Sequence, residues 1–251
     1  MSKVALVSGG ALGIGKASSL QLAKDGFDLV ICDWNKDEGL KTAEACREFG
    51  GQVDFIKVDM SKEADVINFV SQAKKLHNKI DFYLNNSGVI HKAKLFHEIT
   101  EEDADYVINV NIKGCFFGIK HVVKEMLKQG EGHIVVLGSS SGIRAEAGFG
   151  VYSATKKAAL GLAQDAAIEY GKKNIRVNSI CPGGISTPLT NMVGQQMYEE
   201  QFTPPKEPDI LLNNGDLGDV TDISQLVSFL ASDASRYMTG AVLSVDGGIT
   251  L

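Results

Sequence analysis

The sequence predicts a doubly wound α/β fold, in a single domain with about seven parallel strands and a small lid. Short apolar runs such as VALV and HIVVL alternate along the whole chain with longer segments of helical pattern. The runs are continuously apolar, which is typical of parallel strands buried beneath helices on both faces of a sheet. A length of 251 residues suits one large domain better than two.

Seven segments rich in β-branched and aromatic residues are expected to form the strands. In chain order they are KVALVS, DLVICD, VDFIKV, DFYLN, HIVVL, IRVNSIC and AVLSVD. The segments between them carry apolar residues at helical spacing. They predict helices over residues 14–25, 37–49, 62–77, 101–128, 152–172 and 222–232. The domain is expected to span residues 1–251.

One region, about residues 186–221, departs from this alternation. It holds four of the five prolines, and its composition suits one or two short helices. Because it follows directly on the carboxyl end of a strand, we interpret it as a mobile lid over a substrate site. The alternative is a surface insertion with no role in binding.

Composition and charge exclude several classes of protein. With 44% hydrophobic and 22% charged residues the chain is typical of globular domains, and its net charge of −6 disfavours a nucleic-acid partner. The apolar runs are too short to span a membrane, and no charged-then-apolar leader precedes the first strand, so we expect a cytoplasmic protein. The cysteines and histidines show no CxxC, HxxxH or HExxH spacing. We therefore expect neither a disulfide framework nor a metal site.

A glycine-rich turn, VSGGALGIGKASSL, connects the first strand to the first helix. Glycine permits a tight turn and lets backbone N–H groups approach a pyrophosphate at a helix N-terminus. The spacing is GxxxGxG, and a purely structural turn is the alternative. The residues assigned to cofactor binding here are Gly9, Leu12, Gly13, Ile14 and Gly15.

Asp33 ends the second expected strand, eighteen residues after Gly15. A carboxylate at this position can accept hydrogen bonds from the adenosine ribose hydroxyls, and it would repel a 2′-phosphate. Trp34, which follows it, offers no positive charge, although Lys36 is close in sequence. We therefore expect NAD in preference to NADP. The alternative for Asp33 is a helix N-cap.

Two more polar turns follow strands and are assigned to the cofactor. Asp59, followed by Met60, could face the adenine amino group or could cap the next helix. Asn86, Ser87 and Gly88 follow the fourth strand, where asparagine side chains can tie neighbouring strands together and glycine lets the backbone pass close to a nicotinamide ribose.

Ser139, Tyr152 and Lys156 are the candidate catalytic residues. Residues four apart lie on one face of a helix, so Lys156 is expected beside Tyr152. A nearby ammonium favours the phenolate and would lower the pKa of the tyrosine from its usual value near ~10. Ser139 follows the apolar run HIVVLG and so lies at the carboxyl end of a strand, where open α/β sheets bind ligands. A YxxxK pair alone also occurs by chance in helices.

These motifs in this order resemble the short-chain dehydrogenase/reductase family, and the resemblance covers essentially the whole chain. It rests on the glycine turn, Asp33, NNSG, Asn111 in INVNIKG, Ser139, YSATK and PGGIST. The resemblance implies a Rossmann-type fold, a nicotinamide cofactor and a homotetramer. Ser8 stands where the family usually has Thr, and its hydroxyl can make the same bonds.

The resemblance also implies roles for individual residues. Tyr152 would exchange the proton with the substrate oxygen, Ser139 would hydrogen-bond that oxygen, and Lys156 would lower the pKa of Tyr152 and bind the nicotinamide ribose. Asn111 would hold a water that links Lys156 to solvent; alone, it would be interpreted as a buried polar residue that kinks a helix. Further cofactor contacts are implied for Pro182, Gly183, Ile185 and Thr187.

The function expected from these features is NAD-dependent interconversion of a secondary alcohol and a ketone. The substrate contacts are assigned to Ser139, Ser141, Arg144, Glu146, Phe149, Tyr152 and Gly184. The pocket is also expected to be lined by Ser140, Ile143, Val89 and His91 and, from the lid, by Leu189, Met192, Met197 and Tyr198. The apolar lid residues suit a hydroxysteroid or bile acid, whereas Arg144 and Glu146 would suit a small diol or hydroxyketone. The alternatives are an NADPH-dependent reductase of 3-oxoacyl thioesters and a non-catalytic nucleotide-sensing protein.

Overall fold

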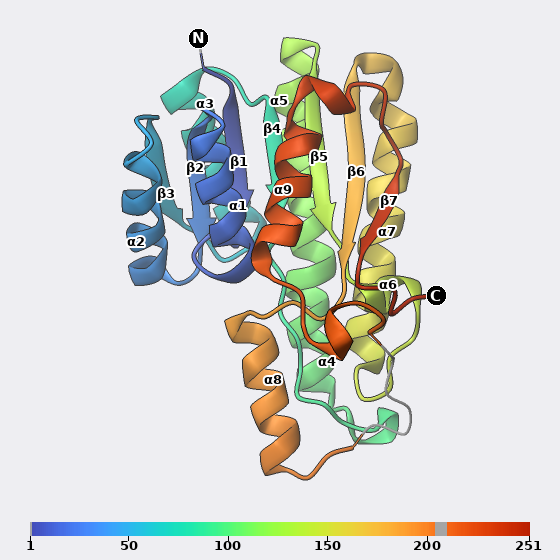
Figure 1. Ribbon diagram of the computed structural model, residues 1–251. Coiled ribbons are helices and arrows are strands. Elements are labelled where there is room, and N and C mark those ends of the chain that lie inside the picture. The colour runs from blue at the N-terminus through green and yellow to red at the C-terminus, as the bar shows by residue number, and fades with distance from the viewer. Residues whose placement is uncertain (1, 204–209) are drawn as a thin grey trace.

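A seven-stranded parallel sheet runs through the centre of the molecule in the order β3-β2-β1-β4-β5-β6-β7 (Figure 1). The computed structural model describes residues 2–203 and 210–251. The strands are β1 (Val4–Ser8), β2 (Asp28–Asp33), β3 (Val53–Lys57), β4 (Phe82–Asn85), β5 (Gly132–Leu137), β6 (Ile175–Pro182) and β7 (Val242–Val245). The predicted α/β fold and its seven parallel strands are confirmed. The strand order reverses between β1 and β4, the position at which such sheets bind ligands.

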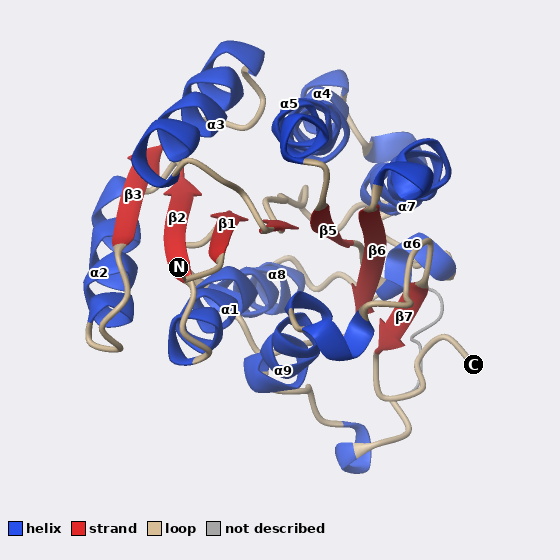
Figure 2. Ribbon diagram, turned by 90° about the horizontal axis from the view of Figure 1, so that it is seen from above, coloured by secondary structure: helices blue, strands red, loops and turns tan. Residues whose placement is uncertain are grey.

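Helices cover both faces of the sheet (Figure 2). On one face lie α3 (Glu63–His77), α4 (Glu101–Val107), α5 (Cys115–Gln129) and α7 (Gly150–Tyr170); on the other lie α1 (Gly13–Lys24), α2 (Lys36–Arg47) and α9 (Val220–Ala231). Successive residues of a strand face opposite sides of a sheet. In β1, Val4 and Leu6 join the core beneath α3, α5 and α7, whereas Ala5 and Val7 join the core beneath α1, α2 and α9. The continuously apolar strands therefore supply two cores.

The helical segment predicted over residues 101–128 changes its type of helix partway along. Between α4 and α5, residues Ile108–Gly114 form a turn of π-helix that contains the buried Asn111. Such turns insert an extra residue into the helical ladder and often occur at functional sites. The predicted helical segment is therefore present, and the π-helical turn within it is a feature that the sequence did not predict.

Two short helices lie at the edge of the sheet where the strands end. They are α6 (Ser140–Ile143) and α8 (Pro188–Glu199), and α8 lies beyond the arrowheads of the strands in Figure 1. Pro188 opens α8, a position where its missing N–H costs nothing, and Thr187 caps the helix by accepting from the backbone N–H of Thr190 at 3.2 Å. The predicted lid thus contains a helix. Its residues 204–209 lie outside the described residues.

All four cysteines are free and buried in the apolar core. Along residues 2–203 and 210–251, no helix has the length and apolar character needed to cross a membrane. Within the same ranges, no group of His, Cys, Asp and Glu side chains is arranged to hold a metal ion.

Candidate active site

The glycine turn after β1 is packed too closely for a side chain at Gly9 or Gly15. Gly9 has a φ of +65°, and a Cβ there would lie 2.9 Å from Asn86 Nδ2; a Cβ on Gly15 would lie 2.0 Å from the Gly9 carbonyl oxygen. Leu12, the N-cap of α1, supplies no side-chain acceptor to the first turn of the helix. The N–H groups at this end are therefore available to an anion such as a pyrophosphate, and the helix dipole favours negative charge there.

The turn after β4 is hydrogen-bonded to this glycine turn. The Asn86 side chain donates to the carbonyls of Ser8 at 3.1 Å and Gly9 at 2.8 Å. The Ser8 hydroxyl accepts from the backbone N–H groups of Asn86 at 3.2 Å and Ser87 at 3.3 Å. The prediction that asparagine ties this strand to its neighbours is confirmed, and these bonds fix the two turns relative to one another.

Asp33 lies half-buried at the end of β2, beside the glycine turn. Its carboxylate oxygens accept from the backbone N–H of Ala11 at 3.0 Å and of Asn35 at 2.9 Å. The N-cap of α2 is Asn35, which accepts from Glu38 N at 3.3 Å, so the N-cap alternative for Asp33 is wrong. Each oxygen of a carboxylate has a further lone pair. The site therefore fits the ribose hydroxyls of a dinucleotide. Trp34 beside it is 71% exposed.

Asp59 uses its carboxylate within its own turn. Its Oδ1 accepts from the backbone N–H of Ser61 at 3.0 Å and from the Ser61 hydroxyl at 2.6 Å, and its Oδ2 lies 3.2 Å from the Lys62 ammonium. The N-cap of α3 is Lys62, so the capping alternative for Asp59 is wrong. Met60 is buried, with its carbonyl close against Gly114.

Ser139, Tyr152 and Lys156 meet at the carboxyl end of β5. Ser139 caps α6, with its hydroxyl 3.2 Å from the backbone N–H and 3.3 Å from the hydroxyl of Ser141. Lys156 is buried, donates to the Leu137 carbonyl at 3.0 Å, and lies 5.8 Å from the centre of the Tyr152 ring. The helical spacing of YxxxK and the position of the serine after a strand thus bring the three side chains together.

The pKa of Tyr152 differs from the prediction. Burial is the largest influence and raises this pKa to about 12, although a hydrogen bond with Ser139 acts to lower it and the charge of Glu146 raises it further. Burial likewise lowers the pKa of Lys156 to about 8. The expected lowering of the tyrosine pKa is therefore wrong for the protein alone, because desolvation of the phenol dominates and Lys156 is not among the groups that shift this pKa.

Asn111 fixes the backbone beside Lys156. Its side chain donates to the Val89 carbonyl at 2.8 Å and to Thr155 Oγ1 at 3.0 Å, and accepts from the Val89 N–H at 2.8 Å. A Cβ on Gly88 would lie 3.3 Å from Lys156 Nζ and 3.5 Å from Asn111 Oδ1. The π-helical turn thus places an amide where it joins the turn after β4 to the helix that carries Tyr152 and Lys156.

The segment after β6 approaches the glycine turn. A Cβ on Gly13 would lie 3.4 Å from the Thr187 side chain, and Thr187 and Ile185 are buried. Gly183 leaves room for the backbone of Asp246, whose Cα would lie 2.7 Å from a Cβ at this position. The residues assigned to the two ends of the cofactor therefore line one continuous edge of the sheet. Pro182 ends β6 within that edge, and Gly184 packs against Leu217.

The side chains assigned to the substrate make different contacts. Glu146 accepts a short hydrogen bond from the Ser141 hydroxyl, and Phe149 packs edge-on against Tyr152 with ring centres 6.5 Å apart. Arg144 instead donates to the carbonyl of Ile249 at 2.9 Å. Its guanidinium is thus turned towards the C-terminal segment, whereas Glu146 and Phe149 lie around the tyrosine.

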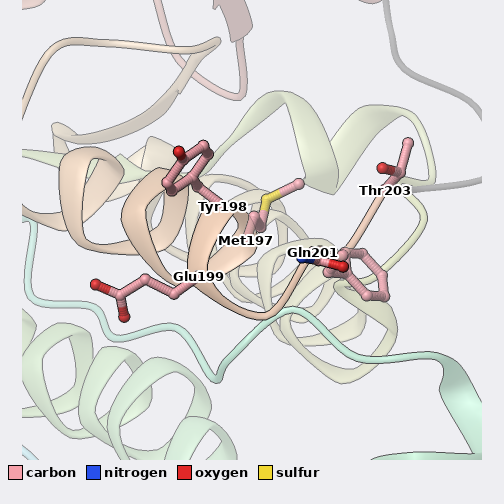
Figure 3. Close-up of a pocket in the computed structure, with 6 residues that line it drawn as sticks. Met197, Tyr198, Glu199, Gln201 and Thr203 are labelled. Carbon is pink, nitrogen blue, oxygen red and sulfur yellow. The ribbon is translucent and has the colours of Figure 1, made fainter.

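Several apolar side chains of the lid helix are exposed to solvent. Leu189 is 40%, Met192 55% and Tyr198 85% exposed. Figure 3 shows Met197 and Tyr198 at an open hollow at the end of α8, which Phe202 and Thr203 also line. That Leu189, Met192, Met197 and Tyr198 line the substrate pocket therefore stays a prediction, and two of them, Met197 and Tyr198, line this hollow.

Gln196 is the buried side chain of α8, a role that the sequence did not indicate. Its amide oxygen accepts from the backbone N–H of Ala93 at 3.0 Å, and Lys92 pairs with Glu200 at 2.9 Å. Phe202 lies against Gly148, where a Cβ would approach its ring to 2.9 Å. The lid helix is thus joined to the segment after β4 and to the loop before Tyr152. A glutamine in a helix is ordinarily interpreted as a solvent-facing residue.

Comparisons with known proteins agree with this geometry. A family model described as enoyl-(acyl carrier protein) reductase matches residues 9–250. The chain is 35% identical to a 2,5-dichloro-2,5-cyclohexadiene-1,4-diol dehydrogenase of Sphingobium indicum, covering 98% of this chain and 95% of that protein. It is 32% identical to a 3beta-hydroxysteroid dehydrogenase of Mediterraneibacter gnavus, with 99% and 95% covered.

A solved structure shares both the fold and the extent of the chain. A 3-ketoacyl-(acyl-carrier-protein) reductase from Brucella melitensis complexed with NADH superposes with a TM-score of 0.89 at 28% identity. The match covers 99% of this chain and 98% of that one. The similarity to these proteins therefore extends over the whole sheet and both helical layers.

Proposed function

The chain belongs to the short-chain dehydrogenase/reductase family, and we propose that it is an NAD-dependent oxidoreductase that interconverts a secondary alcohol and a ketone. The observation that carries this proposal is that Ser139, Tyr152 and Lys156 lie beside one another at the carboxyl edge of the sheet. The glycine turn and Asp33 provide a dinucleotide site at the same edge. A nicotinamide cofactor bound there supplies the hydride acceptor or donor.

The protein's own contribution is to hold the substrate oxygen and to move its proton. The Ser139 hydroxyl and the Tyr152 phenol would both hydrogen-bond that oxygen. With its pKa raised to about 12, Tyr152 carries its proton at neutral pH and is ready to donate it during ketone reduction. In alcohol oxidation the phenol must first be deprotonated so that it can act as the base. The buried Lys156 ammonium favours that phenolate by its charge.

NAD is proposed over NADP because of the charge at the end of β2. The Asp33 carboxylate is held in place by two backbone N–H groups. A 2′-phosphate there would bring two negative charges together, at a cost that discriminates between the cofactors. The NADH in the related ketoacyl reductase structure is consistent with this choice. The bound NADH is an observation on the Brucella melitensis protein and not on this chain.

Two classes of substrate are candidates, hydroxysteroids or bile acids and small diols or hydroxyketones. The steroid relative supports the first class and the diol relative the second. Glu146, hydrogen-bonded to Ser141 near Tyr152, would accept a bond from a substrate hydroxyl. We therefore favour the smaller, more polar class.

Reduction of a 3-oxoacyl thioester by NADPH is the second candidate. The ketoacyl reductase relative favours it, whereas Asp33 and the net charge of −6 oppose NADPH and an acidic carrier protein. Both candidates are tested by incubating the protein with NAD⁺ or NADP⁺ and a panel of secondary alcohols, and with NADPH and an acetoacetyl thioester. NADH formation from an alcohol supports the proposal. Turnover confined to NADPH and the thioester would replace it.

We also propose that the protein is a cytoplasmic homotetramer. Large apolar side chains are exposed on the helical layer opposite α1: Tyr106 is 52%, Phe116 44% and Ile168 80% exposed. Such residues on α4, α5 and α7 suit contacts between copies across two-fold axes. The mass in solution, measured by light scattering, should be four times that of one chain.

A further inference from the structure

His91 has a buried nitrogen without a hydrogen-bond partner. The side chain is 3% exposed. Its Nδ1 lies 2.7 Å from the Lys92 carbonyl oxygen, and because a carbonyl can only accept, Nδ1 is the nitrogen that carries the proton. In the neutral ring Nε2 is therefore a bare acceptor. Among the residues that the structure describes, Nε2 has no partner.

The position of His91 connects it to the candidate active site. Its ring centre lies 6.4 Å from that of Phe149, which packs against Tyr152. On one side along the chain is Gly88, against Lys156 and Asn111; on the other is Ala93, bound to Gln196 of the lid helix. His91 thus lies in a short segment of chain that packs against Lys156 at Gly88 and is hydrogen-bonded to the lid helix at Ala93.

Such an acceptor destabilises the protein unless something bonds to it, because an unsatisfied buried polar atom costs about 1–3 kcal/mol. We propose that His91 is a specificity-determining residue, whose Nε2 accepts a hydrogen bond from a second hydroxyl of the substrate. The inference rests on the proposed function and narrows its substrate class to compact diols and hydroxyketones. A mono-alcohol of the same size leaves Nε2 without a partner, and a substrate ether oxygen, which cannot donate, does the same.

The first test compares substrates on the wild-type enzyme with NAD⁺. The probes are cyclohexanol, the cyclohexanediols with the second hydroxyl on the adjacent, next or opposite carbon, and the mono-methyl ether of the best diol. We expect kcat/KM for at least one diol to exceed that for both cyclohexanol and the ether by about tenfold, because one hydrogen bond in a buried site provides about that factor. Equal values for the diol and its ether would overturn it.

The second test uses variants. His91→Phe keeps a flat ring and removes the acceptor, and His91→Gln restores an acceptor on a flexible chain. The exposed His97 of the same segment provides the matched control, His97→Phe. His91→Phe should lower kcat/KM for the diol about tenfold and change that for cyclohexanol by less than about twofold. His91→Gln should recover part of the loss. An equal loss with both substrates would contradict the proposal.

Binding without turnover separates this inference from the proposed function. An alcohol bound beside NADH cannot react, because no hydride acceptor is present. The affinity of the enzyme–NADH complex for the diol and for cyclohexanol is measured by calorimetry for the wild type and His91→Phe. A preference for the diol that His91→Phe removes supports the role of His91 even if no alcohol is oxidised. Turnover of alcohols without any such preference leaves the proposed function standing and overturns the role of His91.

Discussion

The ammonium of Lys156 lies 5.8 Å from the centre of the Tyr152 ring, while its hydrogen bond goes to the Leu137 carbonyl. The two side chains are therefore neighbours without a direct bond between their polar atoms. Burial acts on both in opposite directions: it raises the pKa of Tyr152 to about 12 and lowers that of Lys156 to about 8. Proton exchange at this site depends on how these two groups titrate.

The direction of the reaction should respond to pH through Tyr152. Below a pKa of about 12 the phenol predominates, and the phenolate fraction grows as the pH rises. Alcohol oxidation, which needs the phenolate, should accelerate with increasing pH; ketone reduction, which needs the phenol, should not. Initial rates in both directions across a pH series measure this. An oxidation rate that falls with rising pH would contradict the assignment of Tyr152 as the base.

Glu146 should influence the pH dependence of alcohol oxidation. Its negative charge is one of the influences that raise the pKa of Tyr152, so Glu146→Gln should lower that pKa and shift the oxidation curve towards lower pH. The glutamine oxygen can still accept from Ser141. Glu44→Gln, on the exposed surface of α2, is the control and should leave the curve in place. A shift towards higher pH would mean that Glu146 acts by another route.

Replacement of Asp33 should weaken the preference for NAD⁺. Asp33→Ala removes the carboxylate that would bind the ribose hydroxyls and repel a 2′-phosphate. The ratio of kcat/KM for NAD⁺ to that for NADP⁺ should fall by about 10- to 100-fold, the value of one or two charge-assisted hydrogen bonds. Asp37→Ala, in the first turn of α2, is the control. An unchanged ratio would place the selectivity elsewhere.

Burial of Lys156 should make stability depend on pH. Its pKa is about 8 in the folded protein and near 10.5 without burial. The unfolded chain therefore binds more protons between these values, and stability rises with pH in that window. Relative to Lys156→Met, the wild type should gain up to about 3 kcal/mol in the free energy of unfolding as the pH rises from about 8 to about 10.5. Urea unfolding at both pH values tests this, and an unchanged difference between the proteins would contradict it.

The sequence predicted the sheet well because each strand is a continuous apolar run, and a parallel strand needs no other signal. It also placed Ser139, Tyr152 and Lys156 together, since a strand end and a helical spacing of four are local features. The π-helical turn at Asn111 was not predicted as such. It depends on bonds to Val89 and Thr155, which are distant in sequence.

The surroundings of the site were harder to predict for the same reason. Periodicity could not orient Arg144, which bonds to Ile249 near the other end of the chain. The apolar residues of α8 suggested which side chains would line a pocket, but they did not indicate that Gln196 is the buried residue of this helix. The pKa of Tyr152 was predicted from its neighbour in sequence, whereas burial, a property of the folded chain, decides it.

The central claim, that Tyr152 moves the proton, is tested most directly by Tyr152→Phe. The substitution removes one hydroxyl and leaves the dinucleotide contacts of Asp33 and the glycine turn in place. We predict that kcat for alcohol oxidation falls by about 10²–10⁴-fold, while the affinity for NAD⁺, measured by calorimetry, stays within about twofold. A variant that binds NAD⁺ and retains more than about one per cent of the wild-type rate would contradict the claim.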